Sequence, residues 1–184
     1  MHNPGRMLWT TIAMAVAVLL ASVAFRTTQQ TTSDETQTEI SFTGLIANPA
    51  TLSLDDVMAM PSVTLKAELI CVSGQSLGVH NWTGVRLSYL LNMTGVQDGA
   101  VKVAFHAADG YETDLTIADA SRPDVIVAYL EDGAPMGEIT RLVVPGMWGY
   151  KWISNIDTIN VVDYDFIGTW ESNGYPDDAA VRRS

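Results

Sequence analysis

The chain has 184 residues and a formal net charge of −11, from 21 acidic and 10 basic residues. This balance argues against a nucleic-acid-binding protein, because a phosphate backbone is bound by a basic face. Hydrophobic residues make up 47% of the chain, enough for one globular domain with its own core and an appendage. With one cysteine, no disulfide forms within the chain, so the fold must depend on that core.

The N-terminal residues predict an association with a membrane. Residues 7–25 form an uncharged, apolar run between Arg6 and Arg26, close to the length of a helix that crosses a bilayer. The small residues at 22–24 also suit a cleavage site, so residues 1–26 are either a membrane anchor or a signal peptide.

Residues 27–38 consist almost entirely of Thr, Gln, Ser, Asp and Glu. They hold nothing apolar to bury and predict a flexible linker. We expect a folded domain at residues 39–176, followed by a C-terminal tail at 177–184. The domain is expected outside the cytoplasm, tethered to the membrane by an N-terminal helix, or secreted if that segment is cleaved.

The first half of the domain predicts short strands and two short helices. In chain order these are a strand over 40–45, a helix that Ser53 caps and Pro61 ends, a strand over 63–72, a loop over 73–83, and a helix over 86–93 that Gly95 closes. The second half predicts strands over 101–105, 111–117, 125–130, 139–144 and 153–162, with turns at Asp109-Gly110 and Asp132-Gly133. Many short strands with a few short helices indicate a mixed, mainly β, α+β domain.

Cys71 lies at the end of an apolar run and is followed by Ser73-Gly74. A thiolate is a strong ligand for soft metals and a strong nucleophile, so a cysteine where a strand gives way to a glycine loop is a candidate reactive group. The alternative is a small buried hydrophobe, which isolated cysteines most often are. A thiol redox protein is a further alternative, but the chain has no second cysteine that could act as the resolving thiol.

Residues 141–153 form a second informative segment, Arg-Leu-Val-Val-Pro-Gly-Met-Trp-Gly-Tyr-Lys-Trp-Ile. It places Arg141 and Lys151 beside a glycine-punctuated turn in apolar surroundings. Turn amides with an adjacent Arg and Lys are a common means of binding phosphate. A hairpin whose cations pair with nearby Asp or Glu explains the segment equally well.

Taken together, these segments resemble the oxidoreductase molybdopterin-binding domain family, which has the sulfite oxidase fold. Further landmarks occur in the same order: 82–87, Asp109-Gly110-Tyr111, 127–129, 133–136 and 168–171. The resemblance covers residues 40–176. It implies a mixed, mainly β, α+β fold of sulfite oxidase type with short helices, and a molybdenum–molybdopterin cofactor.

The resemblance also assigns roles to residues. Cys71 falls where the family's cysteine binds molybdenum. The cofactor-binding residues that it implies are Cys71, Ser73, Asp109, Arg141, Gly149, Lys151, Trp152, Ile153 and Ser154. His80, which follows Cys71 in the predicted loop, and Tyr111, which can line the pocket, join Cys71 as candidate catalytic residues.

The loop after Cys71 indicates the charge of the substrate. Sulfite oxidases have arginines there that hold an anion, whereas residues 73–81 contain no cation at neutral pH unless His80 is protonated. We therefore expect oxygen-atom transfer on a small neutral substrate, sulfoxide-like rather than sulfite, with an unidentified electron-transfer partner. The alternative is a cofactor-free binding module that retains the fold.

Overall fold

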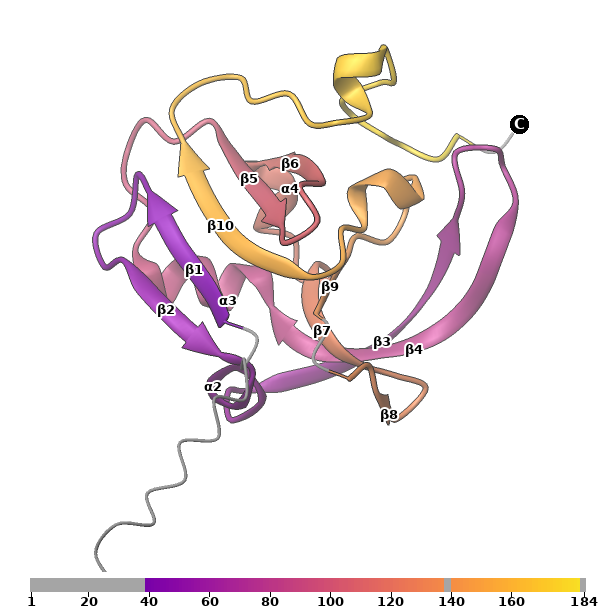
Figure 1. Cartoon of the computed structure of the whole chain (residues 1–184), viewed down its shortest axis with the longest axis horizontal. Helices are drawn as coiled ribbons and strands as arrows, with labels where there is room; N and C mark the ends of the chain where they lie inside the picture. The colour runs from indigo at the N-terminus through magenta and orange to yellow at the C-terminus, as the bar shows by residue number, and fades with distance from the viewer. Residues whose placement is uncertain (1–38, 138–139, 183–184) are drawn as a thin grey trace, which may run out of the picture. The chain divides into compact units, whose positions relative to one another are not determined.

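Two five-stranded sheets organise the part of the chain that the computed structural model describes, residues 39–137 and 140–182 (Figure 1). The predicted anchor or signal peptide at 1–26 and the linker at 27–38 lie outside the described residues. Within the described ranges, no helix has the length and apolar character needed to span a bilayer.

The first sheet has the strand order β2-β1-β10-β5-β6. Its strands are β1 (Glu39–Gly44), β2 (Ala50–Ser53), β5 (Lys102–Ala107), β6 (Glu112–Thr116) and β10 (Ile156–Val162). The pair β1–β10 is parallel and the other pairs are antiparallel. Phe42, Phe105 and Ile159 are buried on these strands and contribute to the core. The sheet therefore joins the two ends of the domain.

The second sheet is antiparallel and contains the longest hairpin of the described chain. Its strands are β3 (Ser62–Ile70), β4 (Ser76–Arg86), β7 (Ile126–Glu131), β8 (Ala134–Pro135) and β9 (Arg141–Val143). β4 pairs with β7 only from Trp82 onward. The outer part of the hairpin, residues 67–81, thus extends as a two-stranded ribbon that we call the hairpin arm (Figure 1).

The loop predicted over 73–83 is therefore wrong, because β4 begins at Ser76. Gly78, His80 and Asn81 are poor strand formers, and the exposed Leu77 and Val79 do not give a buried face. Pairing with β3 fixes this segment as a strand. A tertiary partner, rather than local preference, decides its conformation.

The short helices follow their capping signals. Ser53 accepts a hydrogen bond from Asp56 N (3.1 Å), and the Asp56 carboxylate accepts one from Ser53 N (2.9 Å), so a capping box starts α2 (Leu54–Met58). Helix α3 (Leu87–Thr94) ends at Gly95, which has the left-handed conformation. Both helices were predicted. The chain also forms α4 (Ile117–Ala120) and the 3-10 turns η1 (Gly149–Lys151) and η2 (Glu171–Asn173).

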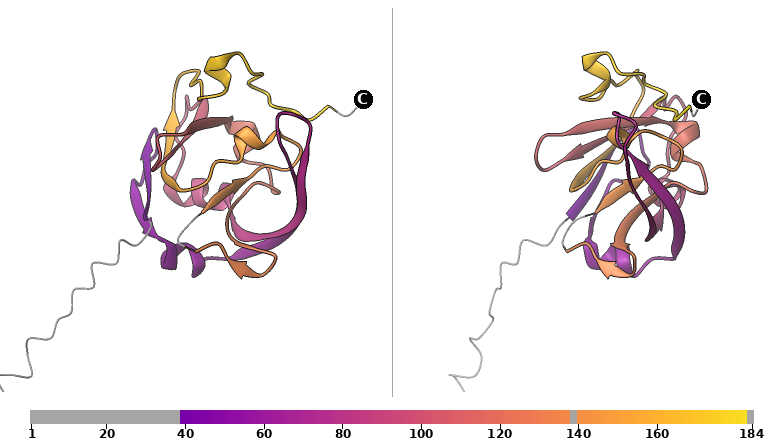
Figure 2. Two further views of the ribbon diagram at one scale, coloured as in Figure 1. Left: turned by 45° about the vertical axis from the view of Figure 1, so that its right-hand side comes forward. Right: turned by 90° about the vertical axis from the view of Figure 1, so that its right-hand side faces the viewer.

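The segment after β10, residues 163–182, crosses the domain and is called here the C-terminal strap (Figures 1 and 2). Ala179 is fully buried, and Ala180 forms a β-bridge with Met147. Thr169 N donates to Glu112 O (2.9 Å). The described residues of the predicted tail at 177–184 are therefore packed onto the domain, which extends beyond residue 176.

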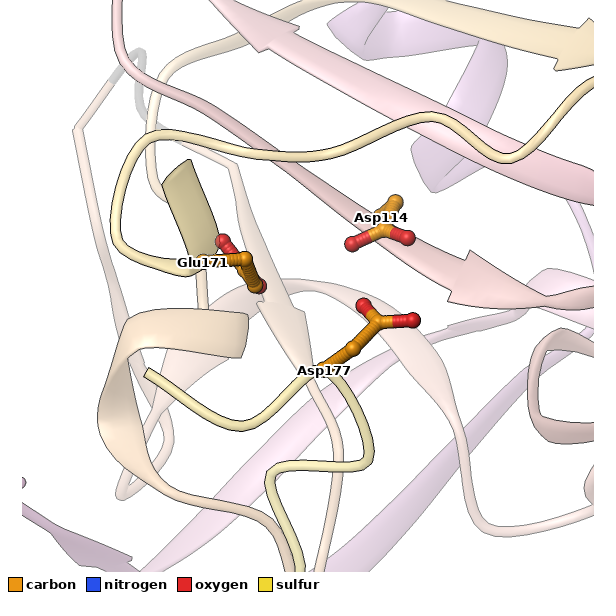
Figure 3. A group of neighbouring side chains, drawn as sticks. All are labelled: Asp114, Glu171 and Asp177. Atoms are coloured by element: carbon orange, nitrogen blue, oxygen red, sulfur yellow. The ribbon is translucent and has the colours of Figure 1, made fainter. Parts of the chain in front are cut away.

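Charged side chains gather between the first sheet and the strap in what we call the buried charge cluster. Its members are the buried Lys102, Lys151, Asp114 and Glu171, with Asp177 at the exposed edge. Lys151 Nζ lies 2.6 Å from both Asp114 Oδ1 and Glu171 Oε1. Lys102 Nζ lies 2.6 Å from Asp114 Oδ2 and 2.8 Å from Asp177 Oδ2. Figure 3 shows the three carboxylates converging, Asp114 from β6 and Glu171 and Asp177 from the strap. Lys102 is 3% exposed.

The carboxylates of the cluster favour the charged forms of its two lysines. Burial disfavours the charged form of Lys102, but hydrogen bonds to Asp114, Asp165 and Asp177 outweigh burial and raise its pKa. Burial also opposes the charge of Lys151, whose pKa is raised by hydrogen bonds to Asp114 and Glu171. A raised lysine pKa means that stabilisation is fully present below the ordinary value of about 10.4 and is lost as the pH rises through the higher value.

We expect Lys102→Met to lower the free energy of unfolding by about 3–5 kcal/mol, because it leaves buried carboxylates with one ammonium fewer. Urea denaturation at pH 7 measures the change. Lys66→Met, at an exposed position of β3, serves as the control and should shift stability by less than about 0.5 kcal/mol. Equal unfolding midpoints for the two variants would show that the cluster does not stabilise the fold.

Candidate functional site

A cavity of about 340 Å³ lies between the tip of the hairpin arm and the chain that follows β9. This volume lies within the range of small-molecule sites, about 300–1,000 Å³. The predicted site residues that line it are Cys71, Asp109, Tyr111, Arg141, Gly149, Trp152, Ile153 and Ser154. The fold thus brings residues from separate parts of the chain to one cavity.

Cys71 lies at the tip of the hairpin arm, directly after β3. Its N–H donates to Gln75 O (2.9 Å) and its carbonyl accepts from Gly74 N (2.8 Å), which fixes a tight turn. Cys71 is partly exposed and forms no disulfide. Hydrogen bonds from the side chain and backbone of Ser73 lower the Cys71 pKa and favour the thiolate. The sulfur is thus a candidate soft-metal ligand rather than a buried hydrophobe.

Arg141 begins β9 and places a guanidinium at the same cavity. One of its terminal nitrogens, Nη1, donates to Trp152 O (3.2 Å), and the group lies over the Trp82 ring, 5.9 Å from its centroid. Its Nε is buried without a hydrogen-bond partner, and no described carboxylate forms an ion pair with it. Burial lowers the Arg141 pKa, opposed by the charge of Glu131. A buried cation with an unused donor is suited to an anionic ligand.

The turn around η1 packs against the hairpin next to Cys71. A Cβ added at Gly149 would lie 3.0 Å from Ile70 O, so glycine permits this close approach. Trp152 and Ile153 are buried, and Leu142 N donates to Ile153 O (2.8 Å), which joins the turn to β9. Ser154 forms a bridge with Arg141 and lies at the cavity. The turn therefore holds one wall in place.

Tyr111 lines the cavity, but its hydroxyl is already engaged. The O–H donates to Tyr150 O (2.5 Å) and so fixes the η1 turn, while burial raises its pKa. Its backbone N–H donates to Asp109 Oδ1 (3.0 Å). In this arrangement Tyr111 supports the wall of the cavity instead of offering a free proton, which differs from the catalytic role that we predicted.

Three predicted residues do not line the cavity. The Lys151 ammonium lies in the buried charge cluster, with its side chain 1% exposed, and its position is explained by Asp114 and Glu171. Its predicted contact with a cofactor phosphate is therefore corrected to a structural role. Ser73 acts on the Cys71 thiol. His80 points toward Asp132, with Nδ1 2.8 Å from Oδ2, instead of into the cavity.

Sequence reasoning missed several cavity residues. Leu77, Tyr150 and Trp170 also line it, together with Leu69 and Val72. Trp170 arrives on the C-terminal strap and stacks on Tyr150, with 6.3 Å between ring centroids. The only signal for Leu77 was its nearness to Cys71. Trp170 occurred in the landmark 168–171, but its place at the cavity depends on the route of the strap, which the buried charge cluster fixes.

Comparisons with known proteins identify the family. The description "Oxidoreductase molybdopterin binding domain" matches residues 27–170. The chain is 32% identical to the oxidoreductase YuiH of Bacillus subtilis, covering 77% of this chain and 74% of YuiH. It is 30% identical to the putative protein-methionine-sulfoxide reductase subunit YedZ1 of Azospira oryzae, and the match covers 77% of this chain and 55% of YedZ1. It is 26% identical to the sulfite oxidase of Arabidopsis thaliana, covering 74% and 44%.

A solved structure agrees with the predicted fold. The sulfane dehydrogenase SoxCD of Paracoccus pantotrophus superposes with a TM-score of 0.64 at 21% identity, covering 68% of this chain and 38% of that chain. The chain spans about half or less of the YedZ1, sulfite oxidase and SoxCD chains. A mainly β, α+β sulfite oxidase-type fold is thus confirmed. The chain belongs to the oxidoreductase molybdopterin-binding domain family, whose members are oxidoreductases with a molybdenum–molybdopterin cofactor.

Proposed function

We propose that the chain is an extracytoplasmic oxidoreductase that transfers an oxygen atom to or from a small neutral substrate, with Cys71 as a molybdenum ligand. The observation that carries the proposal is one cavity that both Cys71 and Arg141 line. These are a soft donor for a metal and a cation for a phosphate, the two ends of a molybdopterin.

The residues of the cavity fit this cofactor. The Cys71 sulfur, with a lowered pKa, would hold molybdenum. The unused Nε of Arg141 and the backbone amides of Ile153 and Ser154 would hold the phosphorylated pterin. When bound, the cofactor supplies the oxygen-atom transfer chemistry. The chain's own part is to orient the cofactor and to exclude water with Leu69, Trp152 and Ile153.

The walls of the cavity favour a neutral substrate. Among the described residues that line it, Arg141 is the one cation, and the proposal assigns it to the cofactor. Val72, Leu77 and Trp170 are apolar, so they offer no charge to hold sulfite. A sulfoxide is neutral and carries apolar substituents, which such a wall accommodates. Several similar proteins are named as subunits of protein-methionine-sulfoxide reductases.

We also propose that the domain works outside the cytoplasm with an electron-transfer partner. The apolar segment 7–25 followed by a polar linker supports a tether. An oxygen-atom transfer changes the cofactor by two electrons, so a partner must restore its oxidation state. The names of relatives as reductase subunits are consistent with a partner.

The activity is tested on protein made in a host that synthesises molybdopterin. The wild-type chain should contain about one molybdenum per chain and reduce a dialkyl sulfoxide without oxidising sulfite. Cys71→Ser should lose at least about tenfold in metal content and in activity, because a hydroxyl is a poor ligand for soft metals. Elemental analysis and a coupled reductase assay measure both. A wild-type protein free of metal and pterin, or a fully loaded and active Cys71→Ser protein, would reject the proposal.

Arg141→Met should affect the loaded and cofactor-free proteins differently. It removes a buried charge without a described carboxylate partner, so the cofactor-free protein should change in unfolding free energy by less than about 1 kcal/mol. Pterin content should fall by about tenfold or more, because a charge-assisted hydrogen bond is lost. Fluorescence of the oxidised, extracted pterin measures this content. Arg86→Met, at an exposed position, should change neither the unfolding free energy nor the pterin content. A similar loss of pterin in Arg141→Met and Arg86→Met would contradict a specific role for Arg141.

The location is tested by fractionating cells that express the full chain. The protein should stay in carbonate-washed membranes and be digested by protease added outside the cytoplasmic membrane, because residues 7–25 would hold it there. Deletion of residues 1–26 should leave it in the soluble, protease-protected cytoplasmic fraction. Full-length protein in that cytoplasmic fraction would contradict the location. Its release as a shortened soluble form outside would indicate a cleaved signal.

A further inference from the structure

The hairpin arm carries Cys71. Its inner face packs on the core through Ala67 and Ile70, and within the described sheet it is joined to the strands beyond β4 at the β7–β8 turn. Beyond Trp82, β4 pairs with β3 alone within the described sheet. Figures 1 and 2 show the arm curving away from β7 toward its tip. The arm also supplies Leu69 and Leu77 to the cavity. Whatever fixes the arm therefore fixes one wall of the site.

The attachment is made by Asp132, in the turn after β7. Its Oδ1 accepts a hydrogen bond from Asn81 N (2.8 Å), and its own N–H donates to Asn81 O (2.8 Å). Its Oδ2 lies 2.8 Å from His80 Nδ1. Asp132 has a positive φ of 50°, which aspartate tolerates in tight hairpin turns. One side chain thus joins the β7–β8 turn to the base of the arm.

We infer that His80 and Asp132 form a clamp that positions the hairpin arm, and through it the Cys71 sulfur and the rim of the cavity. Both are positioning residues, since neither touches the cavity. The assignment of Cys71 as the metal ligand rests on the proposed function. The link between the arm and the β7–β8 turn is argued from the contacts of His80 and Asp132, independently of any cofactor.

The imidazole of His80 is surrounded by acceptors on both sides. Nδ1 faces the carboxylates of Asp132 (2.8 Å) and Glu131 (3.2 Å), and Nε2 lies 3.4 Å from Leu77 O. A neutral imidazole donates from one nitrogen only, whereas an imidazolium donates from both. The geometry therefore suits the imidazolium. In this form the ring donates to Asp132 in the β7–β8 turn through Nδ1 and to Leu77 O on β4 through Nε2.

The ring also occupies space that keeps the arm in shape. A Cβ at Gly78 would lie 2.2 Å from His80 Nε2, so the imidazole covers this glycine. The other side of the contact is the Trp82 ring, edge-to-face with 5.7 Å between centroids. Gly78 is paired with Leu69, which lines the cavity two residues before Cys71. A chain of contacts thus runs from His80 through Gly78 and Leu69 toward Cys71.

The clamp depends on pH because His80 takes part in it. The charged groups that face His80 are Asp132 and Glu131, and Arg141 lies on the Trp82 ring beside it. On β3, Ala67 lies opposite His80. Its neighbours Lys66 and Glu68 therefore point to the other face of the ribbon. The hydrogen bond to Asp132 raises the His80 pKa. The clamp is therefore tight below the ordinary value of about 6.5 and weakens as the pH rises through the higher value of the folded protein.

The test is amide hydrogen exchange of the full, cofactor-loaded chain, followed by mass spectrometry and corrected for intrinsic rates. At pH 5.5, the backbone amides of residues 72–80 should exchange about threefold to tenfold faster in His80→Gln and in Asp132→Gly than in the wild type. Glycine suits the positive φ at 132, so that variant removes the carboxylate without straining the turn. Above pH 8, wild type and His80→Gln should exchange alike.

His106→Gln is the matched control, because His106 Nδ1 also pairs with a carboxylate, Glu112 Oε1 at 2.8 Å, but on β5 and β6. It should leave residues 72–80 unchanged. Release of molybdenum to a chelator, measured alongside, should be faster in both clamp variants at pH 5.5. Unchanged exchange in these variants, or equal loosening by His106→Gln, overturns the clamp. Faster exchange with unchanged metal release overturns the positioning of Cys71. A wild type without molybdenum defeats the proposed function alone, since arm exchange still reports the clamp.

Discussion

The structure depends on the ammonium of Lys151, held between Asp114 and Glu171 at 2.6 Å from each. These residues belong to η1, β6 and η2, which are separate in sequence. A buried ammonium is tolerated only when its partners are all present, because its desolvation is otherwise uncompensated. The contact therefore fixes the η1 turn and the C-terminal strap together. Both supply walls of the cavity, through Tyr150 and Trp170.

Arg141 shows the opposite solution to the same problem. It lies ten positions before Lys151 and is also largely removed from water, yet no described carboxylate forms an ion pair with it and its Nε is unpartnered. Two cations on one segment thus divide the work. Lys151 is satisfied inside the fold and stabilises it, whereas Arg141 leaves its charge available at the cavity. An unsatisfied buried donor costs stability, and a bound anion removes that cost.

Local signals predicted much of the fold, while the division of roles needed distant residues. Ser53 and Gly95 set helix boundaries through their own backbone and side-chain geometry, so the sequence showed them. The family resemblance located Cys71 and Arg141. It also grouped Lys151 with them, since the spacing in the segment treats both cations alike. Only the positions of Asp114 and Glu171 separate them, and those depend on how β6 and the strap pack. Strand β4 was missed for a similar reason, since β3 determines it.

The two ends of the cavity are held by interactions of different strength. The wall near Arg141 belongs to a turn anchored by buried charges, which hold geometry firmly because water does not compete for them. Cys71 lies on a two-stranded arm that packs on the core through Ala67 and Ile70. The pair that joins the arm to the β7–β8 turn, His80 and Asp132, is partly exposed, with side chains 28% and 51% accessible. Exposed pairs contribute little and respond to pH. The wall near Arg141 is thus held by stronger interactions than those that join the arm to the β7–β8 turn.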